Sequence, residues 1–156
     1  MSRIVLDLPD KFEYSLETTV HIGEINYGGH VGTTGMMFLI QDARIGFLDK
    51  FGYKENDVEG YTAMVVDSVV IYKSEAFHGD VLKIEVAVDD FSRYGCALFY
   101  KLIHKKTGRE VARAKTGILF FDRSKQKKTE VPKKFKSIFI HEDQLELGDL
   151  FHDMEK

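Results

Sequence analysis

Apolar and polar residues alternate near the start of the chain, and this alternation indicates the first element of structure. Between residues 11 and 22 nearly every second position is apolar, which predicts a half-buried strand. The apolar positions are Phe12, Tyr14, Leu16, Val20 and Ile22.

A change of period after the glycine-rich stretch 23–32 predicts a helix. Apolar residues recur there at helical spacing, at Met36, Leu39, Ile40, Ala43, Phe47 and Phe51. Thr33 or Thr34 is suited to cap the start of this helix, and Gly52 to stop it. Met37, Phe38, Ile45 and Leu48 make the helix apolar on nearly every side. We therefore expect it at the centre of the structure.

The remaining apolar segments have the short length and β-branched content of strands. They cover residues 63–76, 82–88, 96–104 and 110–122. The links between them are short, which favours antiparallel neighbours joined in a meander. The pattern predicts an α+β fold, in which an antiparallel sheet of five or so strands wraps around one long central helix.

Length, charge and cysteine content narrow the classes of protein to consider. The 156 residues fit a single domain, with a core over about residues 13–136, a basic loop at 125–136 and an acidic tail at 142–156. A net charge of -3 gives no overall attraction to nucleic acid or acidic membranes. One cysteine excludes an internal disulfide, and no run resembles a signal peptide or a membrane span. We expect a soluble cytoplasmic protein.

Residues 23–32 bring the chemically most useful groups together. Glu24, Asn26 and His30 lie among four glycines just ahead of the predicted helix, where unpaired backbone N–H groups are available to a carbonyl or an anion. The glycines could let a ligand approach the main chain, or could only turn the chain into the helix. The candidate binding residues are Tyr27, Gly28, Gly29, Val31, Gly32, Thr33 and Thr34.

Several segments, in this order, resemble hotdog-fold acyl-CoA thioesterases of the 4-hydroxybenzoyl-CoA thioesterase type. The resemblance covers most of the chain and rests on residues 24–31, 42–44, 69–73, 78–82 and 114–117. It implies a hotdog fold, a thioester substrate carried on coenzyme A or on an acyl-carrier protein, and no cofactor. It also implies a homodimer or homotetramer, with the site at a subunit interface.

The chain departs from this family at Asn26, where the family's usual aspartate acts as nucleophile or general base. An asparagine cannot ionise and can do neither. Asn26 could instead orient the attacking water or cap its own turn, and His30 could donate to the thioester oxygen or be purely structural. The base would then be Glu24 or Asp42, the latter serving the partner's site. A surface glutamate and a structural ion pair are the alternatives for these two acids.

Three functions remain open at this point. The first is hydrolysis of an acyl thioester. The second is binding of such a thioester without turnover, which the missing aspartate supports. The third is a hydratase of the same fold, whose motif Asp-x-Asn-Pro-x-His differs here by a glutamate, an absent proline and one extra residue before His30. In each case Lys127, Lys128, Lys133 and Lys134 could approach the phosphates of coenzyme A or be simply solvated.

Overall fold

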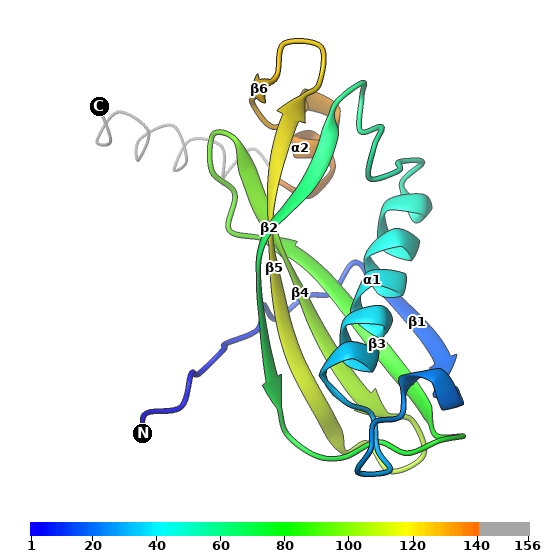
Figure 1. Cartoon of the computed structure of the whole chain (residues 1–156). Helices are drawn as coiled ribbons and strands as arrows, with labels where there is room; N and C mark the ends of the chain where they lie inside the picture. The colour runs from blue at the N-terminus through cyan, green and yellow to red at the C-terminus, as the bar shows by residue number, and fades with distance from the viewer. Residues whose placement is uncertain (141–156) are drawn as a thin grey trace.

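An antiparallel sheet with one long helix across its face makes up most of the computed structural model, which describes residues 1–140 (Figure 1). All four later strands predicted from the sequence are present, and the first strand is shorter than the alternation suggested. The strands are β1 (Tyr14–Thr19), β2 (Thr62–Tyr72), β3 (Val81–Asp89), β4 (Gly95–His104) and β5 (Glu110–Asp122).

The order of the strands differs from the predicted meander in the place of β2. The sheet runs β1-β3-β4-β5-β2, so β3, β4 and β5 form a meander while β2 pairs with β5 at one edge. The prediction that β2 and β3 are neighbours is wrong, because β1 occupies that side of β3. The link 73–80 crosses three strand spacings, about 14 Å, and its eight residues can span about 26 Å.

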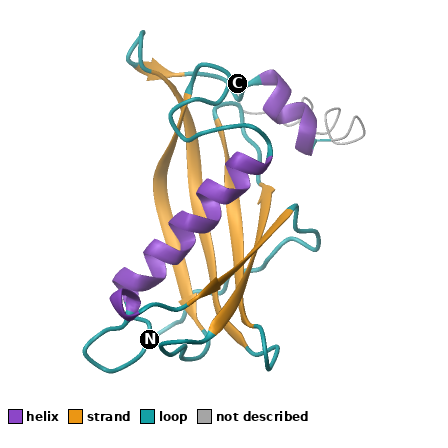
Figure 2. Cartoon of the chain, turned by 90° about the vertical axis from the view of Figure 1, so that its right-hand side faces the viewer, coloured by secondary structure: helices purple, strands orange, loops and turns teal. Residues whose placement is uncertain are grey.

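Helix α1 (Thr33–Lys50) lies along one face of this sheet (Figure 2). Its buried side chains, among them Met36, Leu39, Ile40 and Phe47, pack with the strand residues that face it to form the main core. Met37, Phe38 and Ile45 on its other side are exposed, so within one chain the helix is not buried all round as its sequence suggested. Within residues 1–140 no helix combines the length and apolarity needed to cross a bilayer.

Helix α1 starts one or two residues earlier than expected and ends at the expected stop, Gly52. The N-cap is Gly32 rather than a threonine, and Thr33 is already helical. At the other end Phe51 is the C-cap, followed by Gly52 with φ 80°, the left-handed conformation typical of a helix stop.

The opposite face of the sheet is covered by the N-terminal residues (Figure 1). Leu6, Leu8 and Phe12 pack there against a second, smaller cluster of Ala87, Ala97 and Phe99. The main core therefore lies on the α1 side of the sheet, and the site described below lies on that side too.

The basic segment after β5 is more ordered than a loop. It contains the short strand β6 (Lys127–Lys128) and helix α2 (Lys133–Phe139), whose Phe135 is buried among aromatic rings. The carboxylate of Glu59 accepts the backbone N–H groups of Lys134 and Phe135 and so caps α2 from a distant loop. The predicted acidic tail, 142–156, lies outside the described residues.

Candidate functional site

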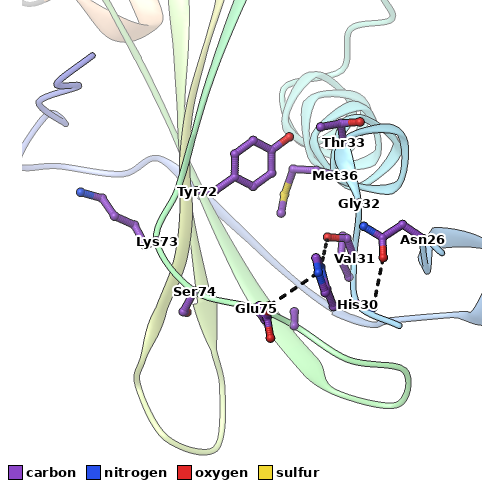
Figure 3. A pocket seen from close by; sticks show the side chains of 11 residues that line it. Asn26, His30, Val31, Gly32, Thr33, Met36, Tyr72, Lys73, Ser74 and Glu75 are labelled. Atoms are coloured by element: carbon purple, nitrogen blue, oxygen red, sulfur yellow. Dashed lines mark hydrogen bonds and ion pairs between the residues drawn. The ribbon is translucent and has the colours of Figure 1, made fainter. Parts of the chain in front are cut away.

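A cavity of about 330 Å³ opens where α1 begins, between residues 26–36 and the segment that follows β2 (Figure 3). Ten of the residues that line it are labelled in Figure 3. One wall consists of Asn26, His30, Val31, Gly32, Thr33 and Met36. The other consists of Tyr72, Lys73, Ser74, Glu75 and Ala76.

A backbone hydrogen bond ties these two walls together. Val31 N–H donates to the carbonyl of Ala76 at 2.8 Å. Arg109 holds the second wall from behind, because its guanidinium donates to the Ser74 hydroxyl at 2.6 Å and to the Glu75 carbonyl at 2.7 Å. The cavity therefore has a fixed main-chain frame, although several of its side chains are exposed.

The amide of Asn26 has its two ends in different environments. Its oxygen accepts the backbone N–H groups of Gly28 at 3.0 Å and His30 at 3.3 Å, which closes the glycine turn. N–H groups can only donate, so the end that meets them must be the oxygen, and the NH₂ group is the other end. Figure 3 shows that nitrogen turned toward Gly32 and the start of α1. A Cβ on Gly32 would lie 3.0 Å from it.

His30 faces Glu75 across the cavity. Its Nδ1 lies 3.2 Å from the carbonyl of Val31, and its Nε2 lies 3.6 Å from a carboxylate oxygen of Glu75. A carbonyl oxygen only accepts, so a hydrogen bond at Nδ1 requires the proton on that nitrogen. In the neutral ring Nε2 is then the acceptor, and it faces the carboxylate.

The start of α1 adds backbone donors to the same cavity. Gly32 and Thr33 line it. The Gly32 N–H already donates to the Glu24 carbonyl at 3.3 Å, whereas the N–H groups of the first helical residues, from Thr33 on, have no partner within the helix. Among the described residues no side chain caps this end, and its first turn contains no acid. The partial positive charge of the helix start is thus available to a ligand oxygen.

Other residues singled out from the sequence lie around the cavity rather than in it. Glu24 does not line it, and its carboxylate lies 3.5 Å from His21 Nδ1. Gly28 and Gly29 belong to the turn that Asn26 closes, and Tyr27 is fully exposed on that turn. Asp42 is exposed on the outer side of α1, about 12 Å along the helix axis from Thr34.

Glu75 was not among the sequence candidates, and neither were Tyr72, Lys73 and Ser74. The sequence pattern predicts that their segment ends a strand whose next neighbour in the sheet is the following strand. In the structure the segment instead crosses from β2 to β3, and this crossover brings it under the start of α1. No local pattern signals this contact. If the link 73–80 had been known to cross the sheet, Glu75 would have been a candidate, because it is a carboxylate that comes just after the long strand β2.

A second, more open groove of about 420 Å³ runs between the outer side of α1 and β2. It is lined by Thr33, Thr34, Met37, Phe38, Gln41, Arg44, Val65 and Ser68. Arg44 is buried beneath it and forms an ion pair with Glu55 in the loop between α1 and β2. The groove shares Thr33 with the cavity at the start of α1, so the two hollows adjoin.

The remaining chemical candidates lie elsewhere. The four lysines at 127, 128, 133 and 134 lie in β6 and α2, at the end of the sheet opposite the start of α1 (Figure 1). Burial raises the pKa of the Cys96 thiol far above its usual range, as expected of a small packed side chain. Among residues 1–140 no three His, Cys, Asp or Glu side chains lie together as metal ligands.

Solved structures share this architecture. A 1,4-dihydroxy-2-naphthoyl-CoA thioesterase from Synechocystis superposes with a TM-score of 0.75 at 16% identity, over 83% of this chain and 97% of that one. A DHNA-CoA thioesterase from Staphylococcus aureus gives 0.70 at 20% identity, over 89% and 93%. At such identities the likeness establishes a hotdog-type fold and nothing further.

The sequence comparisons place the chain in a family. No curated protein sequence matches it. Residues 20–139, which include both walls of the cavity and the whole of α1, match the family described as the Thioesterase-like superfamily. The chain therefore belongs to the Thioesterase-like superfamily.

Proposed function

We propose that this protein hydrolyses an acyl thioester of coenzyme A or of an acyl-carrier protein, in the cavity at the start of α1. The observation that carries this proposal is the convergence of donors on one hollow. Asn26, whose NH₂ group lies beside Gly32, and Thr33, the first residue of the uncapped helix, both line it, so a carbonyl oxygen bound between them would have donors from both.

These donors suit the chemistry of thioester cleavage. When a nucleophile attacks the carbonyl carbon, negative charge develops on the oxygen, and fixed N–H donors stabilise that charge without reorganising. Gly32 permits the close approach, because a side chain there would run into Asn26 at 2.7 Å. Met36 and Tyr72 give the cavity an apolar portion that suits an acyl group.

We further propose that two copies associate through β2 and the outer side of α1. Strand β2 ends the sheet, so within residues 1–140 its outer edge has no strand partner. Large apolar side chains are exposed on this strand and on the adjacent side of the helix. They are Met37, Phe38, Ile45, Met64, Val65 and Val66. A second β2 would pair the edge and cover this surface.

Such a dimer would put the cavity beside the subunit interface, because Thr33 belongs both to the cavity and to the groove between α1 and β2. It also keeps Asp42 as a candidate acid, since Asp42 is exposed one helical turn from Phe38 and Ile45 and could act on the partner's site. A tetramer of two such dimers remains the larger assembly to test.

The test is release of free thiol from a panel of short, long and aromatic acyl-CoA thioesters, with the His30→Ala protein measured in parallel. Aromatic substrates belong in the panel because the Synechocystis and Staphylococcus aureus neighbours are named for one. We expect saturable turnover that falls at least tenfold in the variant. Ligand-dependent thermal stabilisation without thiol release would instead indicate a binding protein, and hydration of an enoyl-CoA would indicate a hydratase.

A further inference from the structure

We propose that Glu75 is the general base of this site, paired with His30, while Asn26 serves as a hydrogen-bond donor. This inference rests on the proposed thioester hydrolysis. It assigns the attacking step to a residue outside the glycine-rich stretch, on the segment that crosses from β2 to β3.

The groups that line the cavity include one carboxylate. Hydrolysis needs a group that accepts a proton from water as its oxygen attacks. Asn26 cannot, because its oxygen is bonded to two backbone N–H groups and its free end is an NH₂. Of the residues lining the cavity, Glu75 is the one carboxylate.

Glu75 combines an exposed side chain with a fixed main chain. Its side chain is 61% exposed, so water reaches it, yet its main chain is fixed on both sides. Arg109 donates to its carbonyl, and the carbonyl of the next residue, Ala76, accepts the N–H of Val31. The Glu75 carboxylate is thus exposed to water while the main chain beside it is tied to the opposite wall, which suits the carboxylate to accept a proton from a water molecule.

The imidazole of His30 lies next to the Glu75 carboxylate. With the His30 proton on Nδ1, facing the Val31 carbonyl, Nε2 faces the Glu75 carboxylate at 3.6 Å with a free lone pair. The Glu75–His30 pair can therefore accept one more proton, either on the carboxylate or on Nε2. A proton taken up by Glu75 can pass to His30 Nε2 and from there to a leaving group, so that neither group has to exchange with bulk solvent during the reaction.

The proposed hydrolysis has two stages, addition of water and loss of the thiol. The water oxygen forms a bond to the thioester carbonyl carbon, its proton moves to Glu75, and the carbonyl electron pair moves onto the oxygen held by Asn26 and the start of α1. When that pair returns, the carbon–sulfur bond breaks with its electrons on sulfur, and the proton held by Glu75 and His30 goes to the thiolate. Water is consumed, and a carboxylic acid and a thiol are formed.

The experiment compares the wild-type protein with Glu75→Gln, and uses Glu17→Gln as the matched control. Glu17 is also a half-exposed glutamate. It lies on β1, at the sheet edge opposite β2, and its carboxylate pairs with Lys105. For Glu75→Gln we expect kcat to fall between about 10²- and 10⁴-fold, the range for loss of a general base, with KM changed less than threefold. Glu17→Gln is expected to match the wild type.

Two further measurements separate a base from a structural residue. Hydroxylamine attacks a thioester through its lone pair without first losing a proton, so Glu75→Gln should still convert acyl-CoA to hydroxamate at close to the wild-type rate. The double variant Asn26→Asp with Glu75→Gln should regain at least tenfold of the lost hydrolysis, because it returns a carboxylate to the other wall.

The outcomes are distinct. Hydrolysis by Glu75→Gln within threefold of the wild type would overturn the assignment while leaving thioester hydrolysis established. Loss of both hydrolysis and hydroxamate formation, with an S-alkyl coenzyme A analogue still bound, would overturn the role of base in favour of positioning. A wild-type protein with no thiol release from any substrate would overturn the proposed function and this assignment together.

Discussion

A carboxamide at position 26 differs from a carboxylate in one group, and that group faces the cavity. The Asn26 oxygen closes the turn through Gly28 and His30, as either residue type could do. The second group is then an NH₂ donor in place of an oxygen that accepts protons. In the mechanism that we propose, position 26 therefore stabilises a negative oxygen instead of taking a proton, and the base lies on the other wall.

Lys73 is the lysine among the residues that line the cavity, and its exposed side chain points away from Met36 and His30 (Figure 3). We predict that Lys73→Ala raises KM for a coenzyme A thioester about two- to fivefold, the size of an exposed charge interaction with a phosphate. KM for the matching N-acetylcysteamine thioester, which lacks phosphates, should not change. Steady-state kinetics with both substrates test this, and Lys11→Ala on the N-terminal arm is the control. An equal change for both substrates would contradict a phosphate contact.

Tyr53 gives the protein a pH-dependent element of stability. Burial, followed by the hydrogen bond from its hydroxyl to Glu59, raises the pKa of Tyr53 to about 12. Its ordinary value is near 10, so the folded state holds this proton more tightly than the unfolded chain. The contribution is complete below pH 10 and is lost as the pH rises toward 12.

We predict that Tyr53→Phe makes the free energy of unfolding fall less steeply with pH in that window. At pH 7 the variant should be slightly less stable, because it lacks the hydrogen bond to Glu59. Urea denaturation at pH 8, 9, 10 and 11 measures the difference. Tyr72 and Tyr100, whose pKa values burial also raises, are present in both proteins and cancel. Parallel curves for the two proteins would contradict the prediction.

At the scale of elements, the position of α1 depends on two glycines that meet different neighbours. A Cβ on Gly35 would lie 2.2 Å from the backbone oxygen of Glu24, and a Cβ on Gly46 the same distance from the hydroxyl of Tyr14. The first obstacle is main chain beside the site, whereas the second is the far end of a side chain that can shift.

We predict that Gly35→Ala destabilises the protein by about 1–3 kcal/mol, as overpacking does, although alanine favours helices. Gly46→Ala should cost less than about 1 kcal/mol. Because Gly35 touches the segment that carries Asn26, the first variant should also lower kcat, and the second should not. Chemical denaturation and thiol release from both variants provide the test. Equal destabilisation would show that the Glu24 backbone yields as readily as Tyr14.

The sequence predicted local elements better than it predicted which elements are neighbours. Alternation and helical spacing identified β2 to β5 and α1 because these signals are local. The place of β2 at the sheet edge was missed, since the length of the link 73–80 permits both a hairpin and a crossover. Helix α2 was missed because its lysine-rich sequence has no clear apolar period. Its stability comes from contacts with distant residues, namely the cap by Glu59 and the packing around Phe135.

The residues of the candidate site also divide into those that a local pattern indicates and those that only contacts between distant segments bring together. Asn26 and His30 were found because they lie in one short motif next to the helix they precede. Glu75 could not be found, because contacts between distant parts of the chain bring it to them. These are the hydrogen bond between Val31 and Ala76, 45 residues apart, and the approach of the Glu75 carboxylate to His30. Whether Glu24 or Asp42 contributes to catalysis stays a prediction.

At the scale of the whole molecule, α1 has two apolar sides and only one sheet to cover them. Within residues 1–140 the core takes Met36, Leu39 and Phe47, and leaves Met37, Phe38 and Ile45 at the surface beside the outer edge of β2. Exposed apolar residues that lie singly are ordinary, but Met37 and Phe38 on the helix line one groove together with Val65 on β2. The apolar sequence of the helix is thus explained if a second subunit supplies the missing cover.

This interpretation predicts that a charge on the outer side of α1 separates the subunits. Met37 and Val81 are each 37% exposed, but only Met37 lies in the groove between α1 and β2. A buried, unpaired glutamate is costly at an interface and nearly neutral on a wet surface. Met37→Glu should therefore yield monomers by light scattering, while Val81→Glu keeps the wild-type mass. Because Thr33 is shared by the groove and the cavity, Met37→Glu should also lose most of its thiol release. A Met37→Glu dimer with full activity would place the subunit contact on another face of the molecule.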